Sequence, residues 1–125
     1  MATTTIKSLK VGNYVIIDGE PCKVLKINIS KPGKHGAAKA RVEAVGLIDN
    51  KKRQLLRPVD TNVEVPIILK KKAQVVSISG DTVQLMDLED YSMFETTIPE
   101  ELKGKLNTGN EIIYWKIGNK ILLKE

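Results

Sequence analysis

The sequence predicts an all-β fold in which two small β domains follow one another along the chain. Hydrophobic residues make up 42% of the 125 residues but aromatic residues only 4%, so the core has to be built from Val, Ile and Leu, which favour strands. Short runs with an apolar residue at every second position are separated by turn signals such as Asp18-Gly19 and Gly118-Asn119. These runs lack the period of an amphipathic helix.

The first half of the chain contains the strand signals of one small barrel. The expected strands are residues 14–17, 22–27, 40–47, 53–57 and 62–65. The first two flank the Asp18-Gly19 turn and should form a hairpin, and the third can pair back against the second. Several short strands in so short a segment predict a barrel of the SH3-like type.

A domain boundary is predicted shortly after Pro66. Proline interrupts the strand pattern there, and the three consecutive lysines at residues 70–72 would be hard to bury in a core shared by both halves. We therefore expect an SH3-like domain at residues 1–68 and a second domain at residues 69–125.

The second half predicts another small barrel that contains one short helical turn. Its expected strands are residues 73–78, 82–86, 111–117 and 120–123. Residues 99–104 begin with proline, continue with two acids and end with glycine, which is typical of a helical turn. This pattern favours the OB-fold, and a generic β-barrel is the alternative that it leaves open.

The positive charge of the chain is concentrated in its first half. The formal net charge is +5, and the residues up to Pro66 include 12 basic and 6 acidic ones, whereas the remainder includes 8 and 9. This asymmetry favours a polyanionic partner for the first half, with nucleic acid as the commonest candidate. A basic solvated surface without a partner is the alternative.

The composition disfavours several other classes of protein. Cys22 is the only cysteine, so neither an intramolecular disulfide nor a cysteine-based metal cluster can form. The chain shows no apolar segment typical of a secretion signal or a membrane span, so we expect a cytoplasmic protein without a membrane partner. Asp87, Glu89 and Asp90 lack a histidine or a calcium-loop pattern, and we interpret them as a solvated turn rather than a metal site.

Residues 30–41, SKPGKHGAAKAR, connect the two strands of the long hairpin. No acid occurs between Glu20 and Glu43, whereas that interval contains six basic residues. They are Lys23, Lys26, Lys31, Lys34, Lys39 and Arg41. Such a hairpin would bind nucleic-acid phosphates in a salt-dependent way and with little sequence specificity. The cations expected to bind RNA are Lys31, Lys39 and Arg41.

Lys34 stands between glycines in this connection. Pro32 restricts one backbone angle, and Gly33 and Gly36 admit conformations closed to other residues, which predicts a shaped turn. The small neighbours would allow Lys34 to enter a narrow channel or an enzyme pocket, but a plain solvated turn is equally compatible with these residues. A nucleotide-binding P-loop is excluded, because its first glycine and the Ser or Thr after its lysine are both missing.

The single histidine and two aromatic residues give weaker signals. His35 has no nucleophile or metal-binding partner nearby in sequence, so we interpret it as an exposed loop residue. Tyr114 and Trp115 are neighbours on an expected strand, so one should face the core and the other the surface. The two could stack on bases as in some OB-folds, although core packing is the favoured interpretation.

Four segments match one known family in the same order along the chain. They are VGNYVIIDGEPCKV at residues 11–24, SKPGKHGAAKAR at 30–41, VEVPI at 63–67 and QVVSISGDTVQLMDLEDY at 74–91. With these segments the sequence resembles the hypusine-containing translation initiation factor 5A family in its short archaeal form, which is related to bacterial elongation factor P. The resemblance covers essentially the whole chain.

This resemblance implies an N-terminal SH3-like barrel, a C-terminal OB-fold and a modified lysine at Lys34. In this family deoxyhypusine synthase transfers an aminobutyl group from spermidine to the lysine, and archaeal members carry either deoxyhypusine or its hydroxylated form, hypusine. Apart from this spermidine-derived group, no cofactor is implied. The residues expected to support the modified lysine are Ser30, Lys31, Pro32, Gly33, His35 and Gly36.

The resemblance also implies a partner and a role. By family analogy the factor binds the ribosome, where it meets ribosomal RNA and peptidyl-site tRNA and points its modified side chain at the peptidyl transferase centre. It would steady the acceptor end of the tRNA and promote peptide bonds, including those at proline-rich stalls. It would then be an accessory to the ribosome and not an enzyme. Pro32 and Ala37 stand where eukaryotic loops typically carry threonine and histidine, and the additional C-terminal helix of eukaryotic members is missing.

An unmodified RNA-binding or RNA-chaperone module is the alternative from another class. It would use the basic hairpin and the OB-fold without any change to Lys34. A stand-alone enzyme such as a nuclease lacks support, because no metal-ligand or acid–base constellation is present in the sequence.

Overall fold

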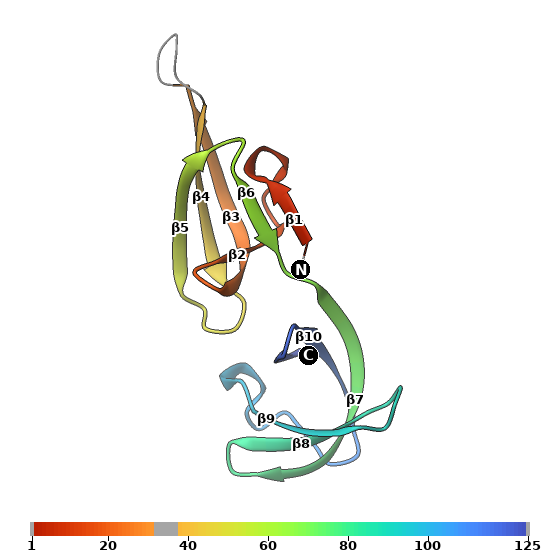
Figure 1. Cartoon of the computed structure of the whole chain (residues 1–125). Helices are drawn as coiled ribbons and strands as arrows, with labels where there is room; N and C mark the ends of the chain where they lie inside the picture. Colours follow the sequence, from red (N-terminus) through yellow and green to blue (C-terminus); the bar gives the residue numbers. More distant parts are fainter. Residues whose placement is uncertain (1, 32–37, 125) are drawn as a thin grey trace. The chain divides into compact units, whose positions relative to one another are not determined.

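The computed structural model describes residues 2–31 and 38–124, and the chain divides into two compact units, Met1–Ile67 and Ile68–Glu125. Figure 1 shows that strands dominate each unit. In the described part of the chain the only helical segments are two 3-10 turns. The predicted all-β class is therefore confirmed for both units.

The first unit is built around a four-stranded antiparallel sheet in the order β2-β3-β4-β5. Its strands are β2 (Tyr14–Ile17), β3 (Glu20–Ser30), β4 (Lys39–Gly46) and β5 (Lys52–Pro58). A second, two-stranded sheet pairs β1 (Ala2–Thr5) with β6 (Asn62–Val65), and the 3-10 turn η1 (Ile6–Ser8) follows β1. The two sheets together form a small barrel.

Side chains that alternate across these strands create the core of the first unit. Its buried members are Ile6, Leu9, Val15, Ile17, Cys22, Val24, Ala40, Val42, Ala44 and Val63. Asp18 and Gly19 have positive φ angles of 53° and 77°, as the two-residue turn of a hairpin requires. The turn signal in the sequence therefore marks the connection between β2 and β3.

The second unit is one five-stranded antiparallel sheet in the order β11-β10-β7-β8-β9. Its elements are β7 (Ile68–Ser79), β8 (Thr82–Asp87), β9 (Met93–Thr97), the 3-10 turn η2 (Glu100–Leu102), β10 (Glu111–Ile117) and β11 (Lys120–Lys124). The long strand β7 pairs with β10 through its first half and with β8 through its second half. A register shift between Val75 and Ser77 bends β7, so the sheet curls into a barrel.

The core of this second barrel lies inside the curled sheet and is closed by the segment around η2. Its buried members are Ala73, Val75, Val83, Leu85, Ile98, Leu102, Ile112, Tyr114 and Leu123. The short helical turn predicted at residues 99–104 is confirmed as η2, and Gly104 follows it with a φ of 78°. Strands β1 and β9 were absent from the expectation.

No helix in the described ranges 2–31 and 38–124 is long and apolar enough to cross a lipid bilayer. The same residues include no group of three or more His, Cys, Asp or Glu that could hold a metal ion.

Candidate functional site

The candidate site is the basic hairpin formed by β3 and β4. These strands pair in antiparallel register as far as Ser30 and Lys39, so the predicted long hairpin is present. Ser30 and Lys31 are exposed at the end of β3. The site residues that lie outside the described part of the chain are Pro32, Gly33, Lys34, His35 and Gly36.

Lys39 and Arg41 are exposed on one face of β4. Ala40 and Val42 alternate with them and are fully buried, because successive side chains of a strand point to opposite faces. In the described part of the chain, neither of the two cations takes part in an ion pair. Core packing thus fixes the strand, and its two charges remain available to an anionic partner.

Strand β5 adds a cation that the sequence did not single out. It pairs with β4 so that Arg41 lies opposite Leu56 and Ala40 opposite Arg57. Arg57 is exposed, and its Nη1 donates a hydrogen bond to the carbonyl oxygen of Leu56 at 2.8 Å. Because directly opposite residues point to the same face of a sheet, Arg57 lies on the side that Ala40 occupies and not on the side of Arg41. No signal in the sequence marked this residue.

The end of the hairpin away from the loop is held by an ion pair. Arg53 donates two hydrogen bonds to Asp49, from Nη1 to Oδ1 at 3.0 Å and from Nη2 to Oδ2 at 2.7 Å. These bonds and one from the amide of Lys51 hold the pKa of Asp49 well below its usual range. The pair covers Gly46, where a Cβ would collide with Asp49 Oδ1 and lie 2.9 Å from Arg53 Nη1. The turn between β4 and β5 is thereby fixed.

Asp87 in the second unit corrects the expectation of a solvated turn. Its side chain is fully buried, and Oδ2 accepts hydrogen bonds from Tyr114 Oη and from Lys71 Nζ, the latter at 3.0 Å. Its Oδ1 accepts hydrogen bonds from the amides of Glu89 at 2.7 Å and Asp90 at 3.2 Å. Glu89 and Asp90 therefore bind Asp87 through their backbone amides. Glu89 and Asp90 are exposed, whereas Asp87 is buried.

Opposing effects set the pKa values of this network. Burial alone would raise the pKa of Asp87, but the hydrogen bonds from Tyr114, Lys71 and the two amides outweigh burial and lower it. Burial and the neighbouring carboxylate raise the pKa of Tyr114 to about 12. Lys71 is the middle member of the lysine run, and its side chain is only 20% exposed because Asp87 compensates its charge. The network joins strands β7, β8 and β10 of the second barrel.

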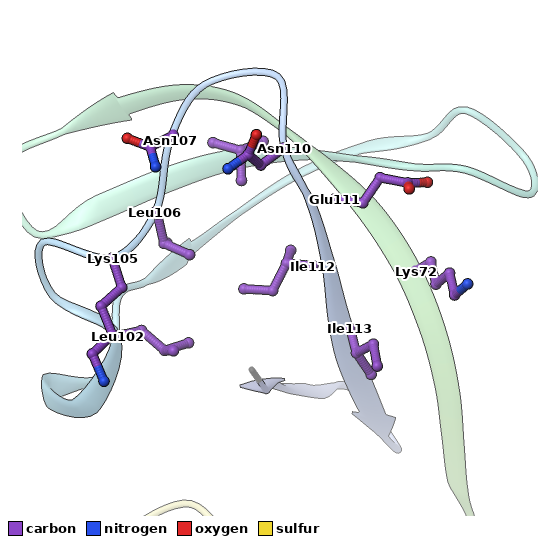
Figure 2. A pocket seen from close by; sticks show the side chains of 10 residues that line it. Lys72, Leu102, Lys105, Leu106, Asn107, Asn110, Glu111, Ile112 and Ile113 are labelled. Carbon is purple, nitrogen blue, oxygen red and sulfur yellow. The ribbon is translucent and has the colours of Figure 1, made fainter.

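The second unit also has a pocket of about 340 Å³ between β10 and the segment that follows η2. Figure 2 shows Leu102, Leu106 and Ile112 directed into it, whereas Lys72 and Glu111 are directed away. Among the described residues that the sequence predicted as functional, which are Ser30, Lys31, Lys39 and Arg41, none lines this pocket. The basic hairpin therefore remains the candidate site.

The fold and the candidate site define the class of this protein. It is a protein of two small antiparallel barrels, the first of which carries a basic hairpin. Residues 2–61 match the family model described as "Translation initiation factor 5A-like, N-terminal". Residues 67–122 match the model described as "Eukaryotic elongation factor 5A hypusine, DNA-binding OB fold". The chain belongs to the translation initiation factor 5A family of hypusine-containing translation factors, and its second barrel is the predicted OB-fold.

Named relatives cover nearly the whole chain. Translation initiation factor 5A of Methanothermobacter thermautotrophicus is 56% identical and is matched over 95% of this chain and 92% of its own. The Methanocella arvoryzae protein of the same name is 55% identical over 93% and 91%. A solved structure of eukaryotic translation initiation factor 5A from Methanococcus jannaschii superposes with a TM-score of 0.89 at 44% identity, covering 99% of this chain and 92% of that one.

The likeness extends to a solved structure of lower sequence identity. A translation initiation factor eif-5a family protein from Naegleria fowleri has a TM-score of 0.81 at 29% identity, covering 99% of this chain and 96% of its own. The fold is thus retained where most residues differ.

Proposed function

We propose that this chain is a translation factor that acts on the ribosome through a deoxyhypusine or hypusine side chain at Lys34. The observation that carries the proposal is the well-paired β3–β4 hairpin, whose exposed cations flank the Gly33-Lys34-His35-Gly36 sequence. Membership of a hypusine-containing family supports the choice of this lysine. In this proposal Ser30, Lys31 and the residues around Lys34 present the side chain.

Deoxyhypusine synthase would supply the modification, with spermidine as the donor of the aminobutyl group. The bond between the aminobutyl carbon and the secondary nitrogen of spermidine breaks, and the same carbon bonds to Lys34 Nζ. A proton passes to the departing nitrogen, so diaminopropane leaves. The product is a longer side chain with two cationic nitrogens, which reaches phosphates beyond the range of lysine.

In the proposed mechanism the first barrel, residues 1–68, brings this side chain to the acceptor end of peptidyl-site tRNA. Lys31, Lys39 and Arg41 bind RNA phosphates, which fixes the hairpin but reads no sequence. The modified side chain steadies the reacting end of the tRNA, and positioning lowers the barrier to peptide bond formation, notably at proline-rich stalls. The factor contributes no catalytic group. The second barrel, residues 69–125, adds RNA contacts, and the site of action is the ribosome in the cytoplasm.

Mass spectrometry of the protein from its own host tests the modification. The peptide that contains Lys34 should carry the mass of an added aminobutyl group, with or without one oxygen, and should resist trypsin at Lys34. Unmodified Lys34 in that material would contradict the proposal. Lys34→Arg should retain the fold but lose stimulation of proline-rich synthesis, and full activity of this variant would overturn the mechanism.

An unmodified RNA-binding or RNA-chaperone module is the second candidate function. The exposed cations of β4 and β5 favour it, because they need no modification to bind RNA. Equal RNA affinity and equal translational activity of modified and unmodified protein would support this candidate over the first.

A further inference from the structure

Most lysines of the second unit lie on other strands than its acids, although Lys71 pairs with Asp87, and Lys103 pairs with Glu100 and Asp81. Six of its eight lysines are on β7, β10 and β11, and the other two follow η2. All acids of the described part of this unit except Glu111 lie between β7 and the end of η2. They are Asp81, Asp87, Glu89, Asp90, Glu95, Glu100 and Glu101. The part of the sheet formed by β7, β10 and β11 is therefore basic, whereas the acids lie mainly on η2 and on the connections beside β8 and β9. The unit as a whole is close to neutral.

The register places three of these lysines around Trp115. Lys70 lies opposite Trp115 on the neighbouring strand, and Lys72 and Lys124 lie on either side of Ile113 in the next row. Lys71 belongs to the opposite side of β7 and is occupied by Asp87. We call Lys70, Lys72, Trp115 and Lys124 the lysine–tryptophan face. The β-strand spacing brings its outer lysines, two strands apart, within about 10 Å of each other across the sheet.

The indole ring gathers two of these cations at one place. Lys70 Nζ lies 4.9 Å and Lys124 Nζ 4.4 Å from the centroid of the Trp115 ring, within the range of a cation–π contact. The electron-rich ring face thus reduces the repulsion between two ammonium groups that would otherwise separate. Core packing, the favoured interpretation of Tyr114 and Trp115, is confirmed for Tyr114, whereas two lysines lie over the ring of Trp115. The ring therefore holds the ammonium groups of Lys70 and Lys124 close together, where both can contact a phosphate group.

The opposite half of the sheet would repel the same partner. On the outer side of β8 and β9, Gln84 lies opposite Glu95 and Met86 opposite Met93, and the acidic connections flank these strands. Glu111 is the acid that shares the side of β10 with Trp115, four positions along the strand. Charge complementarity therefore assigns a polyanion to the lysine–tryptophan face and not to the β8–β9 side.

We propose that the lysine–tryptophan face binds the phosphodiester backbone of RNA, independently of sequence. RNA is chosen over other polyanions because the proposed function places this chain on the ribosome, and to that extent the inference rests on the proposed function. Counterion release drives such binding, so the affinity falls steeply with salt. The face would give the second barrel an RNA contact that does not involve Lys34.

Trp115 is the only tryptophan of the chain, so its fluorescence reports on this face alone. The full unmodified chain is titrated with a short oligouridylate, and free tryptophan serves as a correction for absorbed light. A saturable change in emission is expected. Lys70→Gln and Lys124→Gln should each weaken the response about threefold or more and lower the slope of log K against log salt by about 0.7.

Lys116→Gln is the matched control, because Lys116 is exposed on the same strand but on the side that Tyr114 occupies. It should leave both affinity and slope unchanged. An absent emission change at low salt, or equal weakening by Lys116→Gln, would overturn the inference. Equal saturation by poly-glutamate or by anionic vesicles would also overturn the assignment to RNA.

Failure of this inference and failure of the proposed function give different results. If Trp115 emission does not change with the oligouridylate and the Lys34→Arg variant loses translational stimulation, only the binding of RNA by the lysine–tryptophan face is refuted. A responsive Trp115 together with a fully active Lys34→Arg variant refutes only the role of the modified lysine.

Discussion

Tyr114 Oη donates a hydrogen bond to the fully buried carboxylate of Asp87, and the two side chains join β10 to the end of β8 inside the second barrel. Lys71 Nζ, on the intervening strand β7, completes the contact at 3.0 Å from the same carboxylate oxygen. Three strands are therefore connected through one charge. A buried charge is tolerated only when it is paired and hydrogen-bonded, and here both conditions are met.

Asp87→Asn should destabilise the protein substantially. The amide removes the negative charge that compensates Lys71 and presents an NH₂ group where the carboxylate accepts hydrogen bonds. Breaking a buried pair in this way should lower the free energy of unfolding by about 3 kcal/mol. Urea denaturation at neutral pH would measure this loss. Glu89→Gln is the control, because the Glu89 side chain is exposed and only its amide contacts Asp87. A loss no greater than that of the control would contradict a stabilising role.

The free energy of unfolding should fall at low pH, where Asp87 becomes protonated, and at high pH, where Tyr114 loses its proton. The pKa of Asp87 is lower in the folded state than the ordinary 3.8, so its contribution is complete above about pH 4 and is lost as the pH falls below that. The pKa of Tyr114 is raised to about 12 from 10.0, so its contribution is complete below pH 10 and is lost as the pH rises towards 12.

Absorbance at 295 nm checks the tyrosine prediction directly. The difference between the titrations of the parent protein and Tyr114→Phe should show one phenol that ionises near pH 12. A difference curve centred near pH 10 would show that Tyr114 is not bound to a carboxylate. In urea, the Asp87→Asn variant should have a flatter stability profile than the parent between about pH 4 and pH 2.

The strands of both barrels were predictable to the extent that their side chains alternate. Residues 62–65 and 111–117 coincide with β6 and β10, because each combines alternating apolar residues with clear turn signals. Strand β1 was missed, since its run of threonines carries no apolar alternation and is a strand only through pairing with β6. Strand β9 was missed because only Phe94 on it packs against the core. Pairing partners far away in sequence decided both cases.

The candidate site was predictable as a charge pattern but its surroundings were not. The absence of acids between Glu20 and Glu43 is visible in the sequence, and the exposure of Arg41 follows from alternation with Ala40. The burial of Asp87 was hidden, because its partners Lys71 and Tyr114 are 16 and 27 residues away. The sequence of such a run of acids does not show which of them is buried in the fold.

Gly46→Ala should destabilise the first barrel, because the new methyl group would collide with Asp49 Oδ1 beneath the ion pair to Arg53. Such a tight contact should lower the free energy of unfolding by about 1–3 kcal/mol. Urea denaturation would measure this loss. The control is the same substitution in an Asp49→Ala background, where Asp49 Oδ1 is gone and no longer holds Arg53 close to Gly46. Equal costs in both backgrounds would show that Asp49 is not what Gly46 accommodates.

Arg41→Gln should weaken association with ribosomes without changing stability. Arg41 is exposed on β4 and forms no ion pair in the described part of the chain, so its removal takes away a phosphate contact but no packing. Co-sedimentation with ribosomes at several salt concentrations should give an affinity reduced about threefold or more and a salt slope reduced by nearly one. Lys10→Gln, another exposed cation of the same unit but outside the β3–β4 hairpin, is the control. If both variants bind alike, the hairpin is not the surface that meets RNA.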